Sequence, residues 1–385
     1  MITDFIPFAL PDVGEEEAQA AAETIRSGWL TTGQTSRTFE SEFAAYIGDP
    51  SLHAVAVNSA TAGLHLALEA MGVGPGDEVI VPTWTFTASA EVIRYLGADP
   101  VFTDVDPVTL NIDLADAQRK VTERSKAIIP VHFAGLAVDT VALKDFAQRN
   151  GLKVLEDAAH AIPSSSHGEV VGTGTSDAVV FSFYATKTMT TGEGGMILTR
   201  DEDLAKRARV MRLHGISRDV FDRYTSKVPS WQYEIVAPGY KYNLTDVAAS
   251  IGLVQLAKSD AMAARRAAIG ARYDRELADL PLVLPAHAPD GDRHAWHLYV
   301  LRIADSAPVD RNAFIERMAE EGVGTSVHFI PLHRMPYWRE TYHLNDTDFP
   351  VASAEAEKHV SLPIFSSMSD EQVDRVIEAV RTVLA

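Results

Sequence analysis

Short apolar runs alternate with segments of helical periodicity in the part of the chain before about residue 245. The runs have the length of buried strands, and polar or glycine-containing positions separate them. Strands are therefore expected at residues 78–81, 101–105, 127–133, 154–156, 179–183 and 196–199. Helices are expected between them, as at residues 88–96 and 140–150. Strands that alternate with helices in this way predict an α/β fold whose mostly parallel sheet is covered on both faces.

The pattern changes after that point. Residues 246–280 have helical periodicity and predict one long linking helix. Strand-like and helical segments then alternate again, at residues 297–303, 310–321, 325–329 and 369–384. Ser369 is expected to cap the final helix. We therefore predict a large domain with the N-terminal segment at residues 1–245, and the linking helix with a smaller C-terminal α/β domain at residues 246–385.

Lys187 lies between the strand-like run 179–183 and the glycine cluster 192–195. Lysines are almost never fully buried without a partner. From this segment alone, a surface lysine at the end of a strand is as good an explanation as a lysine held in a pocket. If the side chain is held in a pocket, desolvation lowers the pKa of its amine. The amine then becomes a nucleophile that is able to form a Schiff base.

Asp157 follows the apolar run 152–155, which has the length of a buried parallel strand. Its carboxylate is expected at the carboxyl end of that strand, where ligands bind in open α/β sheets. Alone, such an acid is more often a helix cap or half of an ion pair. Together with Lys187 it matches the needs of pyridoxal 5'-phosphate (PLP), because a lysine holds the aldehyde and an acid keeps the pyridine nitrogen protonated.

A phosphate-binding turn is expected where the strand-like run 53–57 meets a helical segment. Ser59 is a favourable N-cap, and the unpaired amides at a helix start bind phosphate at the positive end of the helix dipole. The amides of Ala60 and Thr61 and the Thr61 hydroxyl are the candidate ligands, although any capped helix has the same pattern. By strand alternation, Ser182 faces away from its apolar neighbours and could offer a further hydroxyl.

Several segments, in this order, together resemble one protein family. They are SGWLTTG (27–33), NSAT (58–61), VPTWTF (81–86), EDAAH (156–160), FSFYATKTMTTGEGG (181–195), GYKYNLTD (239–246) and VHFIPLH (327–333). Over nearly its whole length the chain resembles the fold type I PLP enzymes, whose large domain is aspartate-aminotransferase-like. Within them it resembles the DegT/StrS-type nucleotide-sugar aminotransferases. Asn243 is followed by Leu-Thr-Asp instead of the family's commoner arginine-methionine pair, which leaves the substrate subgroup open.

The resemblance implies roles around the cofactor. Lys187 would carry PLP, and Asp157 would pair with the pyridine nitrogen. Phe86 would stack on the ring, and His160 would lie beside the ring hydroxyl. The positions that match the phosphate site are Ala60, Thr61 and Ser182. Asn243 would reach the phosphate from the neighbouring subunit, so the resemblance implies a homodimer with shared active sites.

Four residues are candidates for the substrate cleft: Trp29, Lys241, His328 and His333. An exposed lysine or a core histidine is the commoner explanation for each alone, but the resemblance assigns these positions to a sugar-nucleotide cleft. Lys241 offers a point charge to a pyrophosphate. The implied reaction moves an amino group from L-glutamate to a nucleotide-linked keto sugar, preferably a 4-keto-6-deoxy sugar aminated at C4, with C3 as the alternative. Lys187 would act as the base that moves the proton.

Composition limits the alternatives. The 385 residues are 46% hydrophobic, and 34 basic against 53 acidic residues give a formal net charge of −19. That charge argues against a nucleic-acid or anionic-membrane surface. There is no cysteine, and no signal-peptide pattern or membrane-length apolar run is present, so a cytoplasmic protein is expected. His294 and His297 look like a metal pair, but at that spacing they would lie on opposite faces of a strand, so no metal is expected.

Three alternatives to this function stay open. A PLP-dependent sugar dehydratase shares the fold and the cofactor, but in that branch histidine replaces the lysine found here at Lys187. A general amino-acid aminotransferase would accept free keto acids in both half-reactions. A non-catalytic regulatory protein with the PLP fold would bind the cofactor without converting it when glutamate is added.

Overall fold

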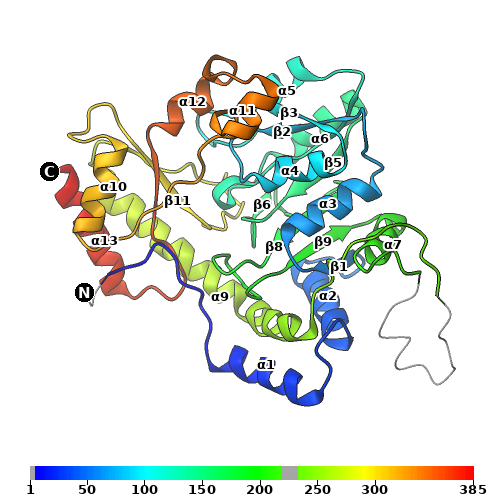
Figure 1. Ribbon diagram of the computed structural model, residues 1–385. Helices are drawn as coiled ribbons and strands as arrows, with labels where there is room; N and C mark the ends of the chain where they lie inside the picture. Colours follow the sequence, from blue (N-terminus) through cyan, green and yellow to red (C-terminus); the bar gives the residue numbers. More distant parts are fainter. Residues whose placement is uncertain (1–4, 218–232) are drawn as a thin grey trace.

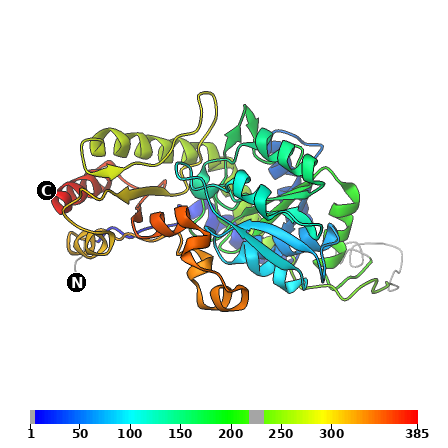
Figure 2. The same cartoon turned by 90° about the horizontal axis from the view of Figure 1, so that it is seen from above.

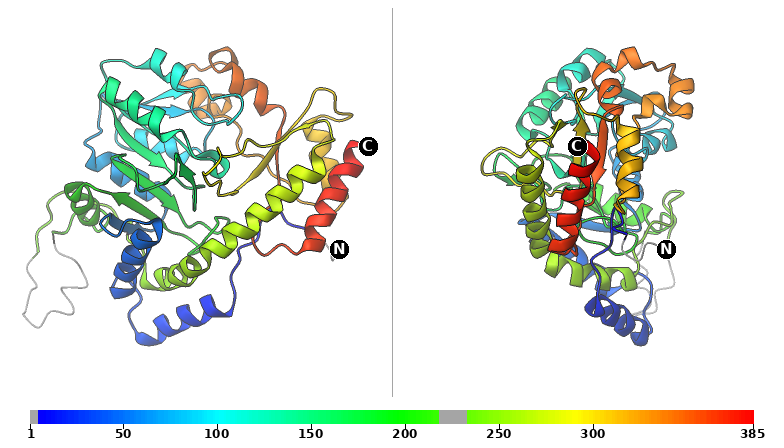
Figure 3. Two further views of the ribbon diagram at one scale, coloured as in Figure 1. Left: turned by 180° about the vertical axis from the view of Figure 1, so that it is seen from behind. Right: turned by 90° about the vertical axis from the view of Figure 1, so that its left-hand side faces the viewer.

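The computed structural model describes residues 5–217 and 233–385. Figure 1 shows a larger part built around a central sheet and a smaller part that carries the C-terminus. The helix α9 (Asp246–Leu277) runs from one part into the other, and α13 (Asp370–Leu384) lies beside it (Figure 3). Seen from above in Figure 2, the two parts lie next to each other along α9. The predicted long linking helix is confirmed, and it ends at Leu277 rather than at residue 280.

The central sheet has seven strands in the order β1-β9-β8-β5-β4-β2-β3. In chain order these are β1 (His53–Val57), β2 (Glu78–Pro82), β3 (Asp99–Thr103), β4 (Ser125–Ile128), β5 (Lys153–Asp157), β8 (Ala178–Ser182) and β9 (Gly195–Thr199). The strand β9 is antiparallel to both of its neighbours, and the other pairs are parallel. The predicted mostly parallel α/β sheet is therefore confirmed. A separate two-stranded sheet consists of β6 (Ser165–Ser166) and β7 (Glu169–Val170).

Two predicted strands of the central sheet differ from the observed strands by two residues or more. β3 begins and ends two residues earlier than the expected range 101–105, and β4 begins at Ser125 and stops at Ile128 instead of at residue 133. Pro130 has no N–H to donate to the ladder, and the chain then turns through the 3-10 helix η1 (Phe133–Gly135). Residues 127–133 are all buried. Burial, rather than strand geometry, therefore explains the apolar composition of most of this run.

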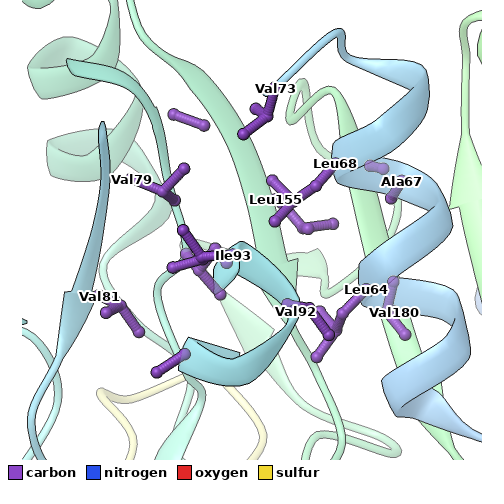
Figure 4. Packing of buried hydrophobic residues seen from close by; sticks show 14 of the residues in the cluster. Leu64, Ala67, Leu68, Val73, Val79, Val81, Val92, Ile93, Leu155 and Val180 are labelled. Atoms are coloured by element: carbon purple, nitrogen blue, oxygen red, sulfur yellow. The ribbon is translucent and has the colours of Figure 1, made fainter. Parts of the chain in front are cut away.

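Helices cover both faces of the central sheet. In chain order they are α2 (Gln34–Ile47), α3 (Ala60–Ala70), α4 (Ala88–Tyr95), α5 (Leu114–Lys120), α6 (Thr140–Asn150) and α7 (Glu202–Met211). The first helix, α1 (Glu15–Ser27), packs against α9 instead. Along β2, Val79 and Val81 pack with α3, α4 and α7, whereas Ile80 packs with α5 and α6. Figure 4 shows the first of these cores, in which side chains of α3 point toward Leu155 of β5. In the described ranges no helix is both long enough and apolar enough to cross a membrane.

The smaller part is built on an antiparallel sheet of three strands in the order β10-β11-β12. The elements of the C-terminal half, after α9 and before α13, are β10 (Leu282–Val283), β11 (Tyr299–Ile303), α10 (Arg311–Glu320), η2 (Leu332–Arg334), α11 (Pro336–Tyr342), η3 (Asp346–Asp348), α12 (Pro350–Ala356) and β12 (His359–Leu362). The two predicted helices are confirmed, and the Ser369 side chain accepts a hydrogen bond from the Gln372 amide (3.2 Å).

The strand predicted at residues 325–329 is wrong. In this segment only Ser326 makes a β-bridge, to Ser361 of β12. The third strand of the small sheet is β12, whose four residues are all buried against β11. Residues 325–329 are all half-buried. A half-buried segment of this length can have the same residue pattern with or without ladder partners, so periodicity could not separate a strand from an irregular segment.

Part of the C-terminal half packs against the larger sheet. Leu332, Trp338 and Phe349 belong to the same core as α3 and α4. The Trp338 ring lies 5.4 Å from the ring of Phe102 on β3, measured between centroids. The division of the chain at residue 245 stays a prediction, and these contacts cross it.

The strand β1 forms one edge of the central sheet and leads into α3. Backbone groups at an edge need partners outside the ladder. The Ala56 amide donates to Glu40 Oε1 (2.8 Å), and Arg212 Nη1 donates to the Ala56 carbonyl (2.6 Å) and to Glu40 Oε1 (2.6 Å). Glu40 and Arg212 are both buried. This ion pair therefore fixes the strand that positions the start of α3.

The substitution Glu40→Ala should leave the Arg212 charge buried without its partner. We expect the free energy of unfolding to fall by about 3–5 kcal/mol. Urea denaturation of the purified variant measures this loss. Glu42→Ala, at an exposed position of the same helix, is the matched control and should change stability little. Equal stability of the two variants would contradict a structural role for the pair.

Candidate active site

The predicted cofactor residues lie at one edge of the central sheet. Asp157 and Ser182 are the last residues of β5 and β8, which are adjacent and parallel. Lys187 follows in the loop after β8, and its backbone amide donates to the Tyr184 carbonyl (3.0 Å). The helix α3 begins at the carboxyl end of β1, which runs in the same direction as β8. The carboxyl ends of these strands therefore bring the residues together.

Lys187 has the electrostatic properties expected of a nucleophilic amine. Its side chain is half-buried, and burial lowers its pKa to about 8 from the ordinary value because the charged ammonium is desolvated. The Asp157 carboxylate acts in the opposite direction and favours the ammonium form. A substantial fraction of the amine is therefore neutral near physiological pH.

Asp157 is held rigidly at the end of β5. It is 6% exposed, its Oδ1 accepts a hydrogen bond from the Ala159 amide (3.1 Å), and its Oδ2 accepts one from Ser89 Oγ (2.7 Å). Sequence reasoning missed Ser89, which is a fully buried hydroxyl on α4. The available signal was a serine among the apolar residues of a short helix, where a buried polar group needs a partner.

The start of α3 has the form of an anion-binding turn. Ser59 caps it, because the Ser59 Oγ accepts from the Ala62 amide (3.1 Å), and the Gly63 amide donates to the Ser59 carbonyl (3.1 Å). The amides of Ala60 and Thr61 precede these bonds and point out of the helix start, so they are available to a phosphate.

The strand β9 passes directly against this turn. A Cβ added to Gly195 would lie 2.8 Å from the Ala60 nitrogen, which is closer than carbon side chains approach backbone. Gly195 pairs with Ser182 in the ladder, so the Ser182 hydroxyl lies on the same edge as the α3 start. The small residues thus leave room for a group at the amides.

Phe86 and His160 complete the expected cofactor environment. The Phe86 side chain is 59% exposed just before α4, which leaves its ring free to stack on another ring. The His160 ring is buried against His297, with centroids 4.2 Å apart. Among the described residues, His160 Nδ1 is buried without a hydrogen-bond partner. Burial, and next to it the charge of Lys187, hold the pKa of His160 well below its usual range, so the ring is neutral.

Asn243 and Lys241 lie beside β1. Asn243 forms a β-bridge with Val57, its Nδ2 donates to Thr32 Oγ1 (2.7 Å), and its Oδ1 accepts from Lys241 Nζ (2.6 Å). Burial lowers the pKa of Lys241. Both residues line a cavity of about 260 Å³ that also contains Arg209. A role of Asn243 toward a second subunit stays a prediction.

The remaining substrate candidates occupy different surroundings. Trp29 is half-buried near Asn243, and its Nε1 donates to the Thr32 carbonyl (3.3 Å). His328 Nδ1 lies 3.0 Å from Ser361 Oγ, and burial with the nearby Lys187 charge lowers the pKa of His328 to about 4. The structure therefore brings His328 to the cofactor edge.

His333 lies in the interior. Its side chain is 1% exposed, with Nδ1 2.9 Å from Thr83 Oγ1 and Nε2 2.9 Å from Ser353 Oγ. Both ring nitrogens are therefore engaged within the chain, and this geometry favours a role in positioning the segment over direct contact with a ligand.

His294 and His297 do not lie on opposite faces of a strand, so that prediction is wrong. β11 begins at Tyr299, so both histidines precede the strand. The His294 ring stacks on Trp296 at 4.1 Å, and His297 packs on His160. Each ring has an aromatic neighbour of its own.

These residues fit PLP. The turn at Ala60 and Thr61 suits a phosphate, Phe86 suits the ring face, Asp157 suits the pyridine nitrogen, and Lys187 suits the aldehyde. A mostly parallel sheet with this arrangement at its carboxyl edge defines the class of the fold type I PLP-dependent enzymes. The prediction of the cofactor is confirmed by the relatives described next.

The chain belongs to the DegT/DnrJ/EryC1/StrS aminotransferase family, whose profile matches residues 11–381. It is 48% identical over 382 residues to the spore coat polysaccharide biosynthesis protein SpsC of Bacillus subtilis, covering 99% of this chain and 97% of that protein. A structure of Streptococcus pneumoniae Spr1654, described as a sugar aminotransferase in its pyridoxamine-phosphate (PMP) form, matches with a TM-score of 0.92 and 36% identity over 98% of each chain. Its PLP form has also been solved. Helicobacter pylori PseC, an aminotransferase involved in pseudoaminic acid biosynthesis, matches with a TM-score of 0.90 and 27% identity over 99% of each chain.

The substitution Gly195→Ala should damage the phosphate turn. The new Cβ forces the start of α3 away from β9, and overpacking of this kind costs about 1–3 kcal/mol of stability. We expect weaker PLP binding together with a lower urea midpoint. Absorption titration with PLP and denaturation of the apoprotein measure the two effects. Gly74→Ala is the matched control, because nothing lies within 4 Å of the added Cβ; the same PLP affinity in both variants would contradict the assignment.

The rate of PLP loading should depend on pH through Lys187. Only the neutral amine attacks an aldehyde, so the rate should rise with pH and level off above about 8, whereas an ordinary lysine would require a pH near 10.5. Stopped-flow absorption of the apoprotein mixed with PLP from pH 6 to 11 measures the profile. Lys187→Ala should still bind PLP, but treatment with borohydride should not attach the cofactor covalently to this variant. A midpoint near that of free lysine would contradict the proposed burial effect.

Proposed function

We propose that the protein transfers an amino group from L-glutamate to the keto group of a nucleotide-linked sugar, preferably a 4-keto-6-deoxy sugar, and releases a nucleotide amino sugar. The observation that carries this proposal is the placement of Lys187 and the buried Asp157 at the carboxyl edge of the sheet, where α3 also begins. The sugar acceptor is supported by the solved relatives, which are described as sugar aminotransferases or as an enzyme of pseudoaminic acid biosynthesis. SpsC supports a place in polysaccharide biosynthesis.

The chain's own residues would divide the work. When bound, PLP supplies an electron sink for the negative charge that develops at a substrate carbon. Lys187 holds the cofactor in the resting state. Once an incoming amine has freed it, the Lys187 amine takes the proton from the donor Cα and later gives a proton to the sugar carbon. A pKa near 8 suits both directions at neutral pH.

Other residues would hold charges and orient groups. Asp157 keeps the proton on the pyridine nitrogen, because its buried carboxylate has that nitrogen as its natural ionic partner. The amides of Ala60 and Thr61 bind the phosphate, and Phe86 fixes the plane of the ring. His160 is neutral, so it can exchange a hydrogen bond with the ring hydroxyl without adding charge.

For the acceptor, we propose that Lys241 binds the nucleotide phosphates and that Trp29 and His328 line the sugar cleft. The cationic cavity at Lys241 supports this, since it also contains Lys206 and Arg209. His333 would position the segment that carries His328. We further propose a cytoplasmic homodimer in which Asn243 reaches the partner's phosphate site.

L-Glutamate should convert bound PLP to the PMP form. The holoprotein should lose its visible absorption when glutamate is added, and a nucleotide-linked 4-keto-6-deoxy sugar should restore it, with L-glutamate as the preferred donor in a panel of amino acids. Lys187→Ala should abolish both changes, because it removes the base, whereas Lys144→Ala, at an exposed lysine of α6, should not. Mass spectrometry of the sugar product measures the second half-reaction.

Each alternative has its own outcome in that experiment. If no amino acid changes the absorption of the holoprotein, a non-catalytic regulatory protein is favoured. Restoration by free keto acids and not by nucleotide sugars would favour a general amino-acid aminotransferase. Release of water from the sugar without incorporation of nitrogen would favour a dehydratase.

A further inference from the structure

We propose that Ser89 and Thr85 are positioning residues for Asp157, and that their two hydroxyl groups orient its carboxylate toward the pyridine nitrogen of PLP. This inference deepens the proposed function and rests on PLP as the cofactor. It concerns two side chains that the resemblance left without a role.

The three side chains form a continuous buried chain of hydrogen bonds. Ser89 Oγ lies 2.7 Å from Asp157 Oδ2 and 2.9 Å from Thr85 Oγ1. Thr85 and Ser89 are 1% and 0% exposed, so water does not compete for these bonds. A hydrogen bond to a charged group in such surroundings is stronger than one between neutral groups.

The direction of the chain follows from chemistry. An ionised carboxylate only accepts hydrogen bonds, so Ser89 must donate its single hydroxyl hydrogen to Asp157. Ser89 Oγ then has only lone pairs to offer Thr85, whose hydroxyl must donate to it. Both hydroxyl groups therefore point toward the carboxylate. The Ala159 amide holds the other oxygen, Oδ1, so the plane of the carboxylate is fixed from two sides.

The geometry differs from that of an ordinary helical serine. Such a serine commonly donates to a backbone carbonyl of the preceding turn. For Ser89 the nearest such carbonyl, that of Phe86, is 3.4 Å away, whereas the carboxylate is at 2.7 Å. The same turn carries Phe86, the ring-stacking candidate. This turn therefore carries both the residue expected to stack on the cofactor ring and the residue that orients the partner of the ring nitrogen.

Ser89→Ala tests the proposal. Loss of the donor should leave Asp157 less well oriented, so the dissociation constant for PLP should rise about tenfold, and the rate of the glutamate half-reaction should fall by a similar factor. Thr85→Val, which keeps the direct bond to Asp157, should change both by about threefold. Equilibrium dialysis and stopped-flow absorption measure these values.

A third readout separates orientation from general damage. The pKa of the pyridine nitrogen, measured from the absorption spectrum of the bound cofactor, should be lower in Ser89→Ala. The reason is that a less well oriented Asp157 stabilises the protonated nitrogen less. Ser89→Thr, which keeps the hydroxyl, should return this pKa toward its native value. Thr103→Val is the matched control, because it removes a buried hydroxyl of β3 that donates to the Val81 carbonyl (3.5 Å) instead of to Asp157.

Two results would overturn the inference. One is a Ser89→Ala protein whose PLP affinity and spectral pH profile match those of Thr103→Val. The other, which applies if Ser89→Ala does not fold, is a Thr85→Val protein with the native profile. Failure of glutamate to change the native holoprotein would instead count against the proposed function, and the spectral comparison would still test Ser89.

Discussion

A lysine amine and a carboxylate held at the carboxyl edge of the sheet form the constraint on which the rest of this structure depends. Burial disfavours the ammonium form of Lys187, Asp157 favours it, and the balance leaves its pKa near 8. An amine with that pKa can both accept and return a proton at neutral pH. Asp157 ends β5, and Lys187 lies in the loop after β8, which is adjacent and parallel to β5. The order of the strands therefore sets up the chemistry.

The segment between β2 and α4 connects this edge with the C-terminal half of the chain. Thr83 Oγ1 contacts His333 Nδ1 (2.9 Å), and Trp84 Nε1 donates to the His328 carbonyl (3.2 Å). The segment continues into Phe86 at the cofactor edge. A displacement of the C-terminal segment would therefore act on the residues around PLP as well as on the sugar cleft. Packing of that segment against the larger sheet, through Trp338, stabilises the arrangement.

The sequence was sufficient for features that depend on local pattern and on strand ends. Asp157 follows an apolar run and Ser59 precedes a helical one, so their places at the sheet edge followed from the parallel sheet. Strand alternation predicted the direction of the Ser182 side chain. Ser89 could not be found in this way, because its partner lies 68 positions away and on another element. The strand at 325–329 was wrong for a related reason: composition records burial, whereas a strand also requires a neighbour with free backbone groups.

The two histidines of the VHFIPLH segment illustrate what burial adds to a motif. His328 is half-buried and close enough to Lys187 for the charge of that residue to lower its pKa, whereas His333 has both ring nitrogens engaged by hydroxyl groups. A neutral ring at the cofactor edge can turn toward an incoming sugar, but a ring with two internal partners would lose those bonds by doing so. The same residue type, five positions apart in one motif, therefore supplies a candidate ligand contact and the anchor that positions it.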